Sequence, residues 1–281
     1  MSEMPPLSEL SDQMERKLSA FFGAFPGAPK TLLLMDYDGT LAPFRVDRYQ
    51  ARPYAGVQEL LERIQSQGKT RMVVITGRPA AEIEPLLGIA PPPEVWGLHG
   101  AEHLYVDGRR ELADPPPAAQ ETLEQVQARL RSNPLGGLFE EKANAAVMHW
   151  RGVPAKKAKE VERRTRELFE PLAKEYGLAL LEFESGLELR TGPEKGDAVR
   201  KLLRESKLDK TNRPARQPAA FLGDDLTDES AFRAIQGHGL GILVRREKRE
   251  SAADVWLRPP EELREFLERW LEACDSVGAE A

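Results

Sequence analysis

Two spacings of apolar residues recur along this chain, and each predicts a different kind of element. Short apolar runs bounded by turn residues are typical of strands buried on both faces of a parallel sheet. We expect strands of this sheet at residues 32–35, 71–75, 94–98, 219–222, 239–244 and 255–257. Apolar residues three or four positions apart predict helices at residues 6–22, 53–67, 82–87, 195–205, 228–235 and 261–273. Because strands and helices alternate, the pattern predicts an α/β fold with a doubly wound sheet and right-handed crossovers.

The middle of the chain follows another pattern. Asp107-Gly108 is a strong two-residue hairpin signal between residues 104–106 and 109–112, and a proline cluster comes soon after it. The elements then change to helix, two strands, helix and two strands, at residues 119–130, 138–142, 145–150, 156–176, 178–184 and 187–190. This order predicts a small antiparallel sheet with helices on one face. We therefore expect an inserted α+β domain at 113–189 between two parts of a core domain, 1–112 and 190–281.

Two carboxylates end the first apolar run. Alternation along an extended chain places Asp36 and Asp38 on the same side, and Gly39 lets the backbone turn away beyond them. Like charges about 4 Å apart cost roughly 4 kcal/mol at an effective dielectric near 20, so the pair favours a divalent cation or a shared proton. Oxygen ligands suit Mg²⁺. The alternative is an ordinary Asp-Gly turn without chemistry.

Polar residues also follow other expected strands or begin the next helix. These are Thr76, Lys195 and the pair Asp224-Asp225. Each alone is compatible with an ordinary role, such as a helix cap or an exposed first-turn residue. Because the carboxyl ends of parallel strands share one edge of a sheet, residues far apart in sequence meet there. The combination predicts one functional site.

Composition narrows the classes of partner. The chain has 281 residues, 41% of them hydrophobic, which is enough to bury a sizeable core. A net charge of −6 argues against nucleic acid as the main partner. The single cysteine, Cys274, excludes an intramolecular disulfide. Neither a membrane-spanning apolar run nor a signal-peptide pattern is evident, so we expect a cytoplasmic protein, active as a monomer and without a membrane partner.

Four segments resemble the ordered motifs of the haloacid dehalogenase (HAD) superfamily of phosphatases. They are Asp36–Thr40, Thr76–Arg78, Lys195-Gly196 and Gly223–Glu229. Three more resemble trehalose-6-phosphate phosphatases within that superfamily: His99–Glu102, residues 139–151 (FEEKANAAVMHWR) and Leu187–Arg190. The resemblance extends from about residue 31 to the last helix. It implies a Rossmann-like parallel-sheet core with an inserted smaller α+β cap domain of type C2b.

The resemblance also implies a reaction. Asp36 would attack phosphorus to form an aspartyl-phosphate, and Asp38 would donate a proton to the leaving sugar and later activate water. Mg²⁺ would be held by Asp36, the backbone carbonyl of Asp38 and Asp224, with Asp225 and Asp228 around it. The phosphoryl oxygens would be bound by Lys195, Thr76 and the amide of Gly77.

By the same resemblance, substrate contacts are expected from a larger set, some of it in the cap. The set is Gly77, Arg78, His99, Glu102, Glu140, Lys142, His149, Arg151, Glu188 and Arg190. The alternative for the cap residues is a charged, solvated sheet face. Two positions depart from the usual family pattern: Glu194 precedes the lysine where a small polar residue is common, and Ala143 stands where glycine is common.

Three functions stay open from the sequence. The first is hydrolysis of trehalose 6-phosphate, a small sugar phosphate. The second is hydrolysis of another phosphorylated glycoside, such as glucosylglycerol phosphate, because the catalytic set reads phosphate and only the cap reads sugar. The third is a phospho-accepting signalling module or a sugar-phosphate-binding module. The second carboxylate, Asp38, and the inserted domain argue against the signalling module.

Overall fold

The computed structural model describes residues 7–26, 28–45, 47–114, 117–132, 138–142, 144–150, 152–183, 186–207 and 217–275. The chain forms two compact units. The first consists of Met1–Glu111, Lys195–Asp224 and Asp228–Ala281, and the second of Leu112–Glu194 with Asp225–Thr227. The expected domain boundaries, and the use of the second unit as a cap, stay predictions.

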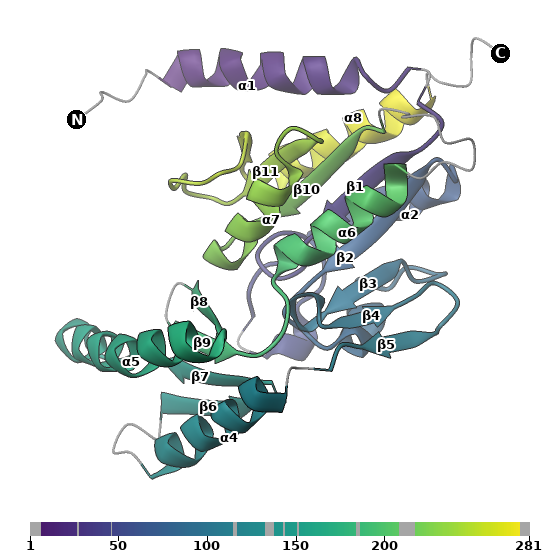
Figure 1. Cartoon of the computed structure of the whole chain (residues 1–281). Coiled ribbons are helices and arrows are strands. Elements are labelled where there is room, and N and C mark those ends of the chain that lie inside the picture. Colours follow the sequence, from purple (N-terminus) through teal and green to yellow (C-terminus); the bar gives the residue numbers. More distant parts are fainter. Residues whose placement is uncertain are drawn as a thin grey trace. The chain divides into compact units, whose positions relative to one another are not determined.

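An eight-stranded sheet forms the centre of the first unit, with the order β12-β11-β10-β1-β2-β3-β4-β5 (Figure 1). Its strands are β1 (Thr31–Met35), β2 (Thr70–Ile75), β3 (Glu94–Gly97), β4 (Glu102–Leu104), β5 (Arg110–Leu112), β10 (Ala219–Gly223), β11 (Leu240–Val244) and β12 (Val255–Leu257). Neighbouring strands from β12 to β3 run parallel, whereas β4 pairs antiparallel with β3. The predicted α/β fold with a parallel sheet is confirmed.

Helices cover both faces of this sheet (Figure 1). They are α1 (Leu7–Phe22), α2 (Val57–Ser66), α3 (Ile83–Leu87), α6 (Lys195–Lys207), α7 (Glu229–Ile235) and α8 (Glu261–Asp275). Leu33 and Met35 of β1 pack in a core cluster with residues of α2 and α8. Leu32 and Leu34 pack in a second cluster with residues of α6 and α7. Successive side chains of a strand point to opposite faces, so these two layers bury β1 completely.

Helix α1 packs on the first unit through aromatic side chains. The ring of Phe22 lies 5.4 Å from that of Phe266 in α8, and Phe25, just after α1, meets Trp270 edge to face at 5.0 Å. Such pairs stabilise by about 0.5–1.5 kcal/mol beyond the apolar area they bury. The predicted packing role of the N-terminal helix is therefore confirmed.

The second unit contains a four-stranded antiparallel sheet with the order β6-β7-β9-β8. Its elements are α4 (Pro117–Arg131), β6 (Phe139–Lys142), β7 (Ala145–His149), α5 (Ala155–Tyr176), β8 (Ala179–Phe183) and β9 (Gly186–Arg190). Met148 and Leu189 on one face of this sheet pack in an apolar cluster with Leu123 of α4 and Phe169 of α5. The predicted small antiparallel sheet with two helices is confirmed.

Some expected boundaries were wrong by a few residues. The helix expected at 53–67 begins at Val57, because Gly56 has a φ of 83° that no right-handed helix adopts. The helix expected at 82–87 is preceded by a 3-10 turn over Ala80–Glu82, and further 3-10 turns lie at Arg48–Gln50, Leu98–Gly100 and Leu226–Asp228. Among the described residues, no helix has the length and apolar character that crossing a bilayer requires.

Candidate active site

Three adjacent strands bring the predicted residues of the first unit together. In the order β10-β1-β2, Asp224 follows β10, Asp36 follows β1 and Thr76 follows β2. Strands β10 and β2 both run parallel to β1, so all three residues lie at the same edge of the sheet. The backbone N–H of Asp36 still donates to Leu222 of β10, 2.8 Å away, which fixes the position of the aspartate.

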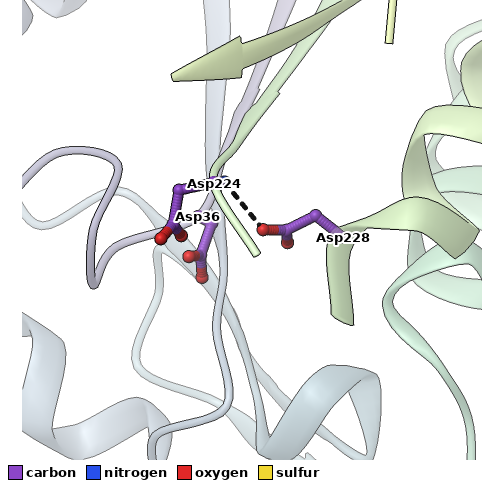
Figure 2. Close-up of side chains that lie close together, drawn as sticks. All are labelled: Asp36, Asp224 and Asp228. Atoms are coloured by element: carbon purple, nitrogen blue, oxygen red, sulfur yellow. Dashed lines mark hydrogen bonds between the residues drawn. The ribbon is translucent and has the colours of Figure 1, made fainter. Parts of the chain in front are cut away.

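Lys195 lies between two buried carboxylates at this edge. Its Nζ atom is 2.7 Å from Asp36 Oδ1 and 2.7 Å from Asp228 Oδ1. All three side chains are buried. The other oxygen of Asp228 accepts from the backbone N–H of Asp224 at 2.9 Å (Figure 2). Asp228, which was expected near the metal, therefore links Lys195 to Asp224 through hydrogen bonds.

Burial and charge shift the titration of this cluster. Burial raises the pKa of Asp36 to about 7; the nearby charge of Lys195 lowers it, and that of Asp228 raises it. Burial alone would lower the pKa of Lys195, but the charges of Asp228 and Asp36 and its hydrogen bonds to them outweigh burial and raise this pKa. The lysine therefore stays charged, and the site favours one further cation beside its carboxylates.

The donor set fits a hard divalent cation. One carboxylate oxygen from each of Asp36, Asp224 and Asp228 lies within 4.8 Å of the others. Figure 2 shows Asp36 and Asp224 side by side, with Asp228 reaching in from the segment before α7. Gly39 comes so close that a Cβ atom there would be 2.0 Å from Asp224 Oδ2. Carboxylate oxygens grouped in this way are ligands of the kind that bind Mg²⁺.

Asp38 is engaged by Arg78 rather than by this cluster. Arg78 Nε donates to Asp38 Oδ2 at 2.6 Å, and Arg78 Nη2 donates to Asp38 Oδ1 at 2.6 Å. This two-pronged contact is the strong form of an arginine–carboxylate pair. Hydrogen bonding to Asp38 raises the pKa of Arg78 despite its burial. The expected substrate contact of Arg78 stays a prediction.

The turn after β2 is held by a strained segment. Leu98 and His99 both have positive φ, 49° and 58°, which costs of order 1–3 kcal/mol per residue. Their backbone N–H groups donate to Arg78 O at 2.9 Å and to Thr76 O at 2.8 Å. A Cβ atom on Gly77 would lie 2.7 Å from His99 Nε2. The segment thus fixes the turn whose Thr76 hydroxyl and Gly77 amide were expected to bind phosphate.

Two other predicted residues lie in different surroundings. Glu102 is fully buried; its Oε2 accepts from the N–H of Ala80 at 2.7 Å, and its Oε1 pairs with Arg110. This geometry supports the backbone after Arg78, and a substrate contact of Glu102 stays a prediction. Asp225 is half-buried, and its Oδ1 accepts from the N–H of Leu226 at 2.7 Å.

Five predicted residues share one face of the second unit's sheet, opposite the face that packs on α4 and α5. They are Glu140 and Lys142 on β6, His149 on β7, and Glu188 and Arg190 on β9. His149 Nε2 lies 2.7 Å from Glu140 Oε2, and Lys142 Nζ donates to Glu188 Oε2 at 3.1 Å. Alternating donors and acceptors of this kind suit a polyhydroxylated ligand. Arg151 and Ala143 lie outside the described residues.

The sequence reading missed three side chains around the site. Glu82 Oε2 accepts from Arg78 Nη1 at 3.4 Å and from Arg48 Nη2 at 2.5 Å. Arg249 Nη2 reaches the carbonyl oxygen of Asp224 at 3.5 Å. Glu82 follows Arg78 by four residues, a spacing that often pairs charges. No comparable signal distinguishes Arg249 within the basic stretch 245–249.

Comparisons with known proteins agree with this arrangement. A family model described as trehalose-phosphatase matches residues 34–258. Trehalose-phosphate phosphatase of Mycobacterium marinum is 29% identical over 261 residues, which are 89% of this chain and 64% of that protein. The chain therefore spans less than two thirds of the length of this curated relative.

Solved structures show the same fold. The C-terminal domain of Candida albicans trehalose-6-phosphate phosphatase aligns with a TM-score of 0.71 at 21% identity, covering 92% of this chain and 96% of that one. A haloacid dehalogenase-like hydrolase from Bacteroides thetaiotaomicron aligns with a TM-score of 0.57 at 18% identity, covering 86% and 99%. The predicted HAD-type fold is therefore confirmed.

Proposed function

Because this chain belongs to the trehalose-phosphatase family, we propose that it is a Mg²⁺-dependent phosphatase that hydrolyses trehalose 6-phosphate to trehalose and phosphate. One observation carries the proposal: Lys195 lies 2.7 Å from both Asp36 and Asp228, at the edge where β1 and β10 end. Transfer of a phosphoryl group to a carboxylate needs a nucleophile and a cation side by side, because the nucleophile and the phosphate are both anionic.

In the first step Asp36 attacks phosphorus through a carboxylate oxygen. The bond from phosphorus to the sugar oxygen breaks as the new oxygen–phosphorus bond forms. Asp38, protonated at this stage, donates its proton to the leaving oxygen, so trehalose departs as a neutral alcohol. The burial of Asp36 supports its role, since a carboxylate out of water gives up little hydration when it attacks.

In the second step a water molecule regenerates Asp36. Asp38 accepts a proton from the water as the water oxygen attacks phosphorus, and the bond between phosphorus and Asp36 breaks. Phosphate leaves, and Asp38 carries the proton for the next cycle. The spacing of two residues between Asp36 and Asp38 suits this division of work, because both carboxylates face the same reacting group.

Charge on the transferred group is balanced by fixed partners. Lys195 neutralises phosphoryl oxygens, and the Thr76 hydroxyl and Gly77 amide donate hydrogen bonds to them. Asp36, the backbone carbonyl of Asp38 and Asp224 would hold Mg²⁺, with Asp228 orienting them. When bound, the ion supplies electrostatic stabilisation of the phosphoryl oxygens. The cluster of three carboxylates supports this assignment.

Recognition of the sugar is assigned to the second unit, acting as a cap. Glu140, Lys142 and Glu188 would exchange their mutual hydrogen bonds for bonds to sugar hydroxyls, together with His149, Arg151 and Arg190. The pairs His149–Glu140 and Lys142–Glu188 support this, since each pair places a hydrogen-bond donor beside an acceptor on the same face of the sheet. Charged side chains that bind hydroxyls give orientation and specificity.

A second candidate within the same reaction is a phosphatase of another phosphorylated glycoside. In this proposal the residues around Asp36 act at the phosphoryl group, and the cap selects the sugar. Glu194, an acid directly before Lys195, departs from the usual family pattern and favours keeping this alternative.

Steady-state kinetics with a panel of sugar phosphates in Mg²⁺ tests the substrate. We expect the largest kcat/KM for trehalose 6-phosphate. A far larger kcat/KM for another glycoside phosphate would identify that compound as the substrate instead. Phosphorylation of the protein without release of phosphate would indicate a signalling module.

A matched pair of variants tests the cap. Lys142→Met should lower kcat/KM for trehalose 6-phosphate about tenfold and leave an aryl phosphate almost unchanged, because the aryl phosphate lacks the hydroxyls. Lys157→Met, at an exposed position of α5, serves as the control. Equal losses with both substrates would contradict sugar recognition by Lys142.

A further inference from the structure

A chain of alternating charges leads away from Asp38 within the first unit. Arg78 binds Asp38 through two donors at 2.6 Å, and its third nitrogen, Nη1, lies 3.4 Å from Glu82 Oε2. Arg48 Nη2 lies 2.5 Å from the same oxygen of Glu82. The order is therefore carboxylate, guanidinium, carboxylate, guanidinium. We propose that Arg78, Glu82 and Arg48 are positioning residues that fix the orientation of the Asp38 side chain for its proton transfers, an inference that rests on the proposed function.

The side chains in this row of alternating charges differ in how deeply they are buried. The side chain of Arg78 is 7% exposed and that of Glu82 is 20% exposed, whereas that of Arg48 is 47% exposed. Arg78 also lies over the ring of Tyr37, 5.8 Å from its centroid, and the Tyr37 hydroxyl donates to Ala51 O at 2.7 Å. A planar guanidinium held on its face and at both ends has one orientation, so it transmits that orientation to the carboxylate it binds.

Asp38 needs this support because the acidic cluster does not provide it. Its carboxylate accepts hydrogen bonds from Arg78, whereas Asp36, Asp224 and Asp228 form the cluster around Lys195. Asp38 is also 26% exposed, so its side chain has room to rotate. A proton donor must lie within hydrogen-bond reach of the leaving oxygen in a defined direction, and an error of about 1 Å can cost of order 100-fold in rate.

The nitrogens of the Arg78 guanidinium bind two different carboxylates. Nε and Nη2 bind Asp38, and Nη1 is occupied by Glu82, so all three nitrogens face carboxylates. Without Glu82, Nη1 would lose its carboxylate partner, and the guanidinium would be free to reorient together with the Asp38 carboxylate. Glu82 therefore acts on the reaction through Arg78, without touching the substrate.

A comparison of leaving groups tests this role. An alkyl alcohol leaves phosphorus only with a proton, whereas p-nitrophenolate leaves without one. The quantity to compare is kcat/KM, because it reports the steps up to phosphoryl transfer and omits the dephosphorylation that both substrates share. The alkyl substrate is trehalose 6-phosphate, or the sugar phosphate that the wild type hydrolyses fastest. The aryl substrate is p-nitrophenyl phosphate.

Glu82→Gln should lower kcat/KM for the sugar phosphate about tenfold and change that for p-nitrophenyl phosphate by no more than about twofold. Asp38→Asn should show the same selectivity with a larger loss, of order 100-fold or more, because it removes the proton donor itself. Glu84→Gln, at an exposed position of α3 two residues further on, is the matched control and should change kcat/KM for neither substrate.

Two results would overturn the inference: equal losses with both substrates, which indicate damage to the phosphate site, or no loss with either in Glu82→Gln. Failure of the proposed function looks different. If the wild type prefers another sugar phosphate, trehalose 6-phosphate is the wrong substrate, yet the comparison of leaving groups still decides the role of Glu82. If Asp38→Asn loses no activity on the sugar phosphate, Asp38 is not the acid and the positioning role falls with it.

Discussion

The ammonium group of Lys195 lies 2.7 Å from the carboxylate of Asp36, and both side chains are buried at the start of α6 and the end of β1. The two residues are 159 positions apart in sequence. The parallel pairing of β1 with β10, together with the packing of α6 on the β1 face that carries Leu32 and Leu34, brings them together. The lysine both holds the aspartate and places a positive charge where a phosphoryl group would bind.

Replacing Lys195 by Met tests this pairing. The variant leaves Asp36 and Asp228 buried without their cation, so we expect the free energy of unfolding to fall by about 3–5 kcal/mol at pH 7. We also expect kcat/KM to fall by more than about 100-fold, because the phosphoryl oxygens lose a charged partner. Urea unfolding and steady-state kinetics measure the two effects. A variant with near wild-type kcat/KM would contradict the role of the lysine.

Mg²⁺ should stabilise the folded protein. The buried carboxylates of Asp36, Asp224 and Asp228 repel one another, and a bound cation removes that repulsion. At a Mg²⁺ concentration of about 100 times Kd the gain is about 2.7 kcal/mol, visible as a rise in Tm. Asp224→Asn should abolish the rise, whereas Asp12→Asn, at an exposed position in α1, should retain it. An equal rise in both variants would place the ion elsewhere, and chelation should remove activity from the wild type.

A carboxylate far from the nucleophile predicts the pH dependence of stability. Glu94 Oε1 lies 2.7 Å from His103 Nε2, and Glu94 accepts two further bonds from Arg71. Burial alone would raise the pKa of Glu94, but the hydrogen bond to His103 and the charge of Arg71 outweigh it and lower the pKa below 4.5. As the pH falls, Glu94 therefore binds a proton in the unfolded chain before it does so in the folded protein. The stability that its ionised carboxylate contributes is present above pH 4.5 and is lost as the pH drops through the lowered pKa.

Glu94→Gln removes that contribution. At pH 7 the variant should be less stable by about 2–3 kcal/mol, because charge-assisted hydrogen bonds are lost. The difference from wild type should shrink as the pH falls from 4.5 through the lowered pKa, because Glu94 of the folded wild type then becomes neutral. Denaturant unfolding at a series of pH values measures the difference in the free energy of unfolding at pH 7 and its change with pH. A difference that does not depend on pH would show that packing rather than charge explains the effect.

Much of the site was predictable because it follows from sheet topology. Asp36 and Asp224 each end an apolar run, and parallel strands place such ends on one edge. Lys195 was found because it begins the helix after the inserted segment. The contact between Arg78 and Asp38 was not predictable, since no pattern in the sequence states which carboxylate an arginine binds 40 residues away.

The limits of prediction in the fold have local causes. The start of α2 at Val57 depends on Gly56 adopting positive φ, which a glycine permits but does not require. Glu102 was expected to contact substrate through its resemblance to a family motif. Its oxygens bind the N–H of Ala80 and the side chain of Arg110, contacts set by tertiary packing.

The central claim is that Asp36 carries the phosphoryl group during turnover. Rapid acid quench of the wild-type enzyme with Mg²⁺ and trehalose 6-phosphate, followed by mass spectrometry of its peptides, identifies the modified residue. The account predicts one phosphoryl group on Asp36, and neither phosphorylation nor turnover in Asp36→Asn. A phosphoryl group on another residue, or continued turnover in Asp36→Asn, would contradict it.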